Sequence, residues 1–120
     1  MKNELHFRLM YKLKQMDDVE RQIKILNAKV EKPFSVENIE RYWKDKTIFE
    51  CSLKTSVQGP TKEEYVYNTI VKAHSISKVW EINGPFQNGE NNLIFEGVFN
   101  EEVEGKPLKW AHFMLELKGL

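Results

Sequence analysis

The chain has 120 residues, and its 18 Lys and Arg balance its 18 Asp and Glu, so the formal net charge is zero. Hydrophobic residues make up 41% and charged residues 30%, the composition of an ordinary globular protein of one domain. No run approaches the roughly 18 apolar residues of a membrane span, and zero net charge argues against general nucleic-acid binding, which Lys and Arg drive. The N-terminus has no signal-peptide pattern and Cys51 is the only cysteine, so we expect a cytoplasmic protein that binds neither nucleic acid nor membranes.

Residues 5–13 alternate between apolar and polar side chains, which predicts a half-buried strand. A helix is then predicted to begin at Asp17, because Asp17 and Glu20 have the spacing of a capping box. Pro33 is expected to end that element. The apolar residues of the helix recur at helical spacing: Val19, Ile23, Leu26 and Val30.

The middle of the chain is predicted to hold a short helical piece, a strand and a second helix. Ser35 could cap the helical piece, whose apolar residues are Val36, Ile39, Tyr42 and Trp43. Residues 47–57 alternate as a strand, with an apolar side that includes Phe49, Cys51 and Leu53. Thr61 and Glu64 form a second capping box, and the helix that follows has one apolar face: Val66, Ile70, Ala73 and Ile76.

From Lys78 onward the pattern indicates strands joined by turns. A short strand from Val79 to Asn83 is expected to close at a Gly-Pro pair, and residues 92–100 form a longer strand. Turns are expected at Asn88-Gly89 and at Glu104-Gly105. The last strand opens at Pro107 and directs four residues to the core: Ala111, Phe113, Leu115 and Leu117.

Together these elements predict that residues 1–120 form a single two-layer α+β domain in the order β-α-β-α-β-β-β. The two β-α-β connections favour parallel neighbours and the late hairpins an antiparallel meander, so we expect one twisted mixed sheet with two helices on one face. The expected core draws on every element: Phe7, Leu9, Leu13, Ile23, Leu26, Phe49, Leu53, Val66, Ile70, Phe95, Phe113 and Leu115.

The sheet face away from the helices should be polar if it only meets water. Alternation instead places several apolar residues there: Met10, Ile48, Ile94, Val98, Leu108, Trp110 and Met114. An apolar centre with a charged rim is the usual build of a binding patch. The alternative is that these are scattered exposed residues, or that a loop folds over them. If the first and last strands are neighbours, four polar residues of this face could also converge: His6, Arg8, His112 and Glu116.

Between Lys78 and Lys106 the chain holds six glutamates and no Lys or Arg: Glu81, Glu90, Glu96, Glu101, Glu102 and Glu104. Such a region can attract a basic partner through its field, although charge on strand edges also serves simply to deter edge pairing. We therefore predict a partner-binding surface formed by Glu96, Glu101, Glu102, Glu104, Trp110, His112 and Met114.

No nucleotide, zinc or nucleophile motif is present, so we expect no catalytic site, no cofactor and no metal. Cys51 alternates inward and is expected to be an inert thiol. The first hypothesis is a non-enzymatic protein-binding module, for example an inhibitor or immunity-type protein that blocks a nuclease. The second is a small-ligand or catalytic domain with a pocket between sheet and helices that uses His112 and Glu116. The third is a symmetric homodimer that buries the outer face.

Overall fold

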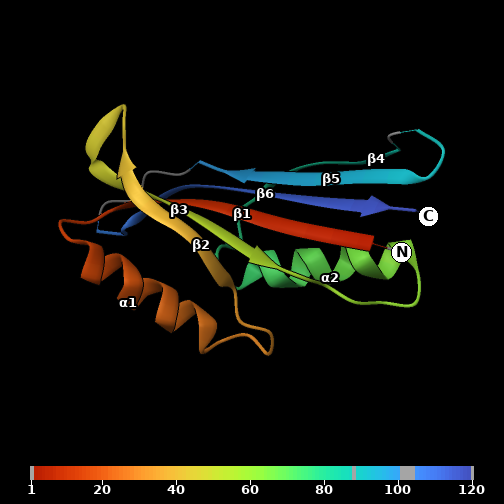
Figure 1. The fold of residues 1–120 in the computed structure, drawn as a ribbon, viewed down its shortest axis with the longest axis horizontal. Helices are drawn as coiled ribbons and strands as arrows, with labels where there is room; N and C mark the ends of the chain where they lie inside the picture. The colour runs from red at the N-terminus through yellow and green to blue at the C-terminus, as the bar shows by residue number, and fades with distance from the viewer. Residues whose placement is uncertain (1, 88, 101–104, 120) are drawn as a thin grey trace.

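The computed structural model describes residues 2–87, 89–100 and 105–119, and within these ranges the chain forms six strands and two helices (Figure 1). The α+β class and the two helices agree with the sequence prediction. The order is β-α-β-β-α-β-β-β, which has one strand more than expected. The elements are β1 (Lys2–Lys12), α1 (Met16–Asn27), β2 (Ser35–Tyr42), β3 (Asp45–Thr55), α2 (Lys62–His74), β4 (Glu81–Gln87), β5 (Asn92–Phe99) and β6 (Leu108–Lys118).

The strands form one open sheet in the order β2-β3-β1-β6-β5-β4, and every described pair of neighbours is antiparallel. The prediction of a mixed sheet was therefore wrong. The added strand β2 reverses the chain before β3, so β3 runs antiparallel to β1 instead of parallel to it. The connection through α2 leads from β3 to β4 at the far edge of the sheet, so it creates no parallel neighbours either.

The extra strand β2 occupies the segment that was expected to be helical. Its residue Ile39 stands opposite Cys51 of β3 and packs against the core, whereas most of the strand is exposed, as befits a sheet edge. Asn27 anchors the chain on its way into β2: its side chain accepts from the backbone N of Phe34 (2.8 Å) and donates to its carbonyl (3.3 Å). These bonds direct Phe34 into the core. For the β2 segment, pairing with β3 outweighs any local preference for a helix.

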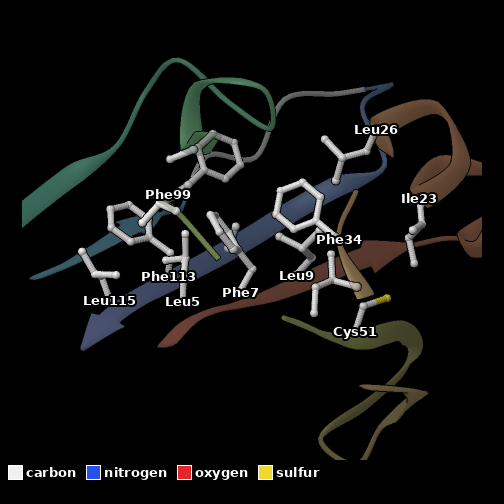
Figure 2. Close-up of a cluster of buried hydrophobic side chains, with 14 of the residues drawn as sticks. Leu5, Phe7, Leu9, Ile23, Leu26, Phe34, Cys51, Phe99, Phe113 and Leu115 are labelled. Atoms are coloured by element: carbon white, nitrogen blue, oxygen red, sulfur yellow. The ribbon is translucent and has the colours of Figure 1, made fainter. Parts of the chain in front are cut away.

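The core lies between the sheet and the two helices, which cover the same face of it (Figures 1 and 2). Phe113 is at its centre, with ring centroids of Phe7, Phe95 and Trp80 at 5.7, 5.5 and 5.1 Å. Most of the expected core residues are buried, and three are only partly buried against the cluster: Leu13, Val66 and Ile70.

The two predicted helix starts have different outcomes. Thr61 caps α2, since its side-chain oxygen accepts from the backbone N of Glu64 at 3.2 Å. The cap predicted at Asp17 is wrong: α1 begins at Met16, and its N-cap Gln15 makes no side-chain capping bond. Asp17 lies in the first turn, where its charge still suits the helix dipole.

The end of β4 also differs from the prediction. The strand does not close at Asn83 but continues through Gly84 and the cis bond to Pro85, with a shift in register against β5. Gly84 accommodates this with φ of +95°, and a Cβ there would meet the backbone of residue 86. Gly89 and Gly105 have positive φ, as turns require, but Asn88 and Glu104 lie outside the described residues.

Candidate binding surface on the outer sheet face

The first and last strands are neighbours, as the predicted cluster of polar residues on the outer face required. β1 and β6 form the centre of the sheet, where Arg8 stands directly opposite His112 and Met10 opposite Trp110. His6 stands opposite Met114 in the next row. The convergence expected from alternation is therefore confirmed for Arg8 and His112, whereas His6 lies beside Glu37.

Trp110 lies at the middle of this face and is held by two side chains. The guanidinium carbon of Arg8 lies 5.4 Å from its ring centroid, and the ring of His112 stacks nearly parallel to it at 6.1 Å. Trp110 is half-buried, while its neighbours Ala111 and Phe113 are fully buried on the core side. The predicted register of the last strand is thus confirmed from Trp110 onward.

Two carboxylates complete the cluster and connect four strands. Glu50 of β3 pairs with Arg8 at 3.0 Å, and Glu96 of β5 lies 3.2 Å from Nε2 of His112. Glu50-Arg8-Trp110-His112-Glu96 therefore runs across β3, β1, β6 and β5, and we call it the outer-face chain. Each of its polar side chains contacts a neighbour, and Arg8 and His112 both lie against the indole of Trp110.

Around the outer-face chain the sheet carries half-buried apolar side chains: Met10, Ile48, Ile94, Val98 and Met114. Leu108 was expected among them, but this was wrong. A register shift after Met10 pairs Leu108 with Tyr11, and Leu108 packs against the core. An irregularity of one residue is enough to move a side chain to the other face.

Carboxylates outnumber cations on this face. By register it carries Glu4, Glu37, Glu40, Glu50, Glu81, Glu96 and Glu116 among the described residues, against Arg8, Lys12, Lys54 and Lys118. His6 lies 3.3 Å from Glu37, and Lys118 pairs with Glu116 at 3.6 Å. The surface thus has an apolar centre and a mainly acidic rim.

Four of the predicted partner-binding residues share this surface: Glu96, Trp110, His112 and Met114. Glu101, Glu102 and Glu104 lie outside the described residues. Glu116 is on the same face but stands opposite Glu4 and Ile94, so it does not join the outer-face chain.

A basic cavity of about 690 Å³ at one end of the sheet was not anticipated from the sequence. Its described cations come from three separate segments: Lys12, Lys14, Arg41, Lys46, Lys106 and Lys109. Arg41 has a structural role there, because it donates to the carbonyls of Lys46 (2.6 Å) and Lys14 (3.2 Å) and covers the ring of Phe49. The excess of cations in the first half of the sequence was the available signal, but the strand order was needed to bring the segments together.

Cys51 is fully buried, as predicted for an inert thiol. Burial and the neighbouring charge of Glu50 raise the pKa of its thiol to about 12, so the nucleophilic thiolate is suppressed at neutral pH.

Among the described residues no three His, Cys, Asp or Glu side chains are placed to hold a metal ion. Neither described helix is long and apolar enough to cross a membrane. Comparisons of the chain with protein-family models, with curated proteins and with solved structures gave no match.

Proposed function

We propose that this protein is a non-enzymatic protein-binding module whose outer sheet face docks a partner with a basic surface. The observation that carries the proposal is Trp110, a large aromatic side chain oriented by Arg8 and His112 at the centre of an open sheet face. Tryptophan and arginine dominate the energetics of protein interfaces. A side chain that is already oriented loses little rotamer freedom when it binds.

The charge distribution supports a basic partner. Glu50, Glu96 and Glu116 belong to a face on which carboxylates prevail, and Glu101, Glu102 and Glu104 precede β6 in the chain. Such a surface steers a positively charged partner and makes association sensitive to salt. An inhibitor or immunity-type protein fits this pattern, since glutamates could occupy a nuclease groove in place of phosphates.

The test is a comparison of captured proteins across matched variants. Immobilised wild type is compared with a triple variant of Glu101, Glu102 and Glu104 to Lys and with a control that changes helix carboxylates, Glu20→Lys with Glu63→Lys. We expect one or more basic proteins to bind wild type and the control, to be lost from the triple variant and to elute with rising salt. Equal capture by all three proteins would contradict the acidic mechanism.

A homodimer through the same face is the competing reading. Burial of the half-buried apolar centre of this face by a second copy would be favourable. A two-fold contact, however, places the acidic rim of one copy on that of the other. Like charges in contact oppose association. Sedimentation at micromolar concentration decides the matter: we expect a monomer, and a dimer abolished by Trp110→Ala would support the homodimer instead.

A further inference from the structure

A second cavity, of about 420 Å³, lies between the helical layer and one end of the sheet. Its described walls come from α1, from residues 75–79 after α2, and from the ends of β1, β5 and β6. The volume is within the range of small-molecule sites, which are typically 300–1,000 Å³ and mostly apolar with a few polar groups. The apolar part of its wall is Leu26, Ile76, Phe99, Pro107 and Leu108.

Tyr11 supplies a polar group inside this cavity. The residue is only 5% exposed, yet within the described part of the chain its hydroxyl has no hydrogen-bond partner. Tyr11 is one of the residues that line the cavity, and no described side-chain oxygen or nitrogen is both unpaired and sealed from solvent. Burial raises the pKa of Tyr11 above its ordinary value, which keeps the hydroxyl a neutral donor.

The mouth of the cavity combines exposed apolar surface with positive charge. Ile25 is 48% and Val79 61% exposed. Exposure of these apolar side chains to water is unfavourable, and a bound apolar group would reduce it. Lys29, Lys78 and Lys106 approach the mouth from three separate segments, and no salt bridge between described residues involves any of them.

We propose that this cavity binds a small amphipathic carboxylate. Its apolar body would lie against Leu26, Ile76 and Phe99, and its carboxylate would accept the hydrogen bond of Tyr11 in the field of the lysines. A hydroxyl that the protein leaves unpaired favours a ligand that supplies an acceptor. The site goes beyond the protein-binding face, because Tyr11 points to the inner side of β1 and Met10 to the outer side.

The probe is decanoate, titrated into the full chain by calorimetry and by ¹H–¹⁵N NMR. We expect saturable one-to-one binding with shifts at residues 22–29, 75–79 and 106–108. Tyr11→Phe removes only the hydroxyl and should weaken binding about tenfold, the effect of losing a hydrogen bond to a charged acceptor. Tyr67→Phe on the exposed side of α2 is the matched control and should bind as wild type does.

Two further measurements test the proposal independently if Tyr11→Phe folds poorly. Lys78→Gln should weaken decanoate binding and reduce its salt dependence, while Lys62→Gln on the first turn of α2 should not. Decanol, which lacks the charge, should bind less tightly than decanoate. Absence of saturation at millimolar decanoate, equal binding of decanol, or NMR shifts confined to the outer face would each overturn the proposal. The Trp110→Ala variant should bind decanoate normally, which separates this site from the protein-binding face.

Discussion

The guanidinium of Arg8 covers the indole of Trp110 across the β1–β6 pair, at 5.4 Å from ring centroid to guanidinium carbon, while Nη2 of the same guanidinium pairs with Glu50 at 3.0 Å. Residues 102 positions apart in the sequence thus contact each other on the outer face. A tryptophan restrained in this way is suited to bind, because its orientation does not have to be created at the moment of contact.

Trp110→Ala should weaken partner binding by about 2 kcal/mol or more while leaving the fold largely intact, since the side chain is half-buried on the face away from the core. Titration calorimetry with the captured partner measures the first effect and urea denaturation the second. Trp43→Ala is the control, because Trp43 is 78% exposed at the β2–β3 turn. Loss of binding in the Trp43 variant alone would place the interface elsewhere.

Leu53→Ala should lower the free energy of unfolding by about 2–5 kcal/mol. Leu53 is fully buried in the core, and its strand β3 lies between β1 and β2. Urea denaturation followed by circular dichroism checks this. Lys54→Ala, the exposed neighbour on the same strand, should change the midpoint little. Similar midpoints for the two variants would mean that the strand register is misassigned.

The two helix starts should respond differently to substitution. Thr61→Ala removes the bond to the Glu64 amide and should destabilise by about 1 kcal/mol, whereas Asp17→Ala should cost only the smaller helix-dipole effect. Gln15→Asp should stabilise, because it supplies the cap that α1 lacks. Thermal denaturation of the three variants measures these changes. A loss of stability in Asp17→Ala as large as that in Thr61→Ala would contradict the prediction.

Gly97→Ala should destabilise the fold by about 1–3 kcal/mol through overpacking. A Cβ atom at Gly97 would lie 2.7 Å from Cζ of Phe113, closer still to its Cε2, and 3.1 Å from Cδ1 of Ile82. Combining it with Phe113→Leu should give a loss smaller than the sum of the two single losses, because the two changes share one space. Additive losses in chemical denaturation would disprove the steric explanation.

Alkaline pH should destabilise the protein partly through Cys51. The thiol pKa is raised from 9.0 to about 12 when folded, so the stabilising effect is complete below pH 9 and is lost as pH rises toward 12. Cys51→Ala should therefore show a shallower decline of unfolding free energy between pH 9 and about 11. Urea midpoints across that range measure it, and parallel curves for wild type and variant would refute the assignment.

Most elements of this fold could be predicted from periodicity. The alternation in β1, β3, β5 and β6 and the apolar face of α2 are strong local patterns, and the burial of Phe7, Leu53 and Phe113 follows from them. β2 escaped prediction because Val36 and Ile39 are three residues apart, which is a helical spacing; in the strand an irregularity between Val36 and Asn38 places them opposite Leu53 and Cys51. Its pairing with β3 decided the matter, and that pairing is a tertiary contact.

The outer face was likewise predicted from the sequence only in part. Alternation alone placed Trp110, His112 and Met114 on one face, and composition alone showed the acidic stretch. The contacts of Trp110 with Arg8, of His112 with Glu96 and of Arg8 with Glu50 required the strand order, because a sheet brings distant segments together by hydrogen bonds that any sequence can make.

By itself the sequence determined which side chains face inward, because a period of two or 3.6 assigns each residue to one face of its own element. Only the tertiary structure decided which strands are neighbours, that the sheet is antiparallel throughout, and that Leu108 turns to the core. It also decided that Tyr11 lines a cavity with segments distant from it in the sequence. These features depend on contacts between segments far apart in the chain, which no local pattern encodes.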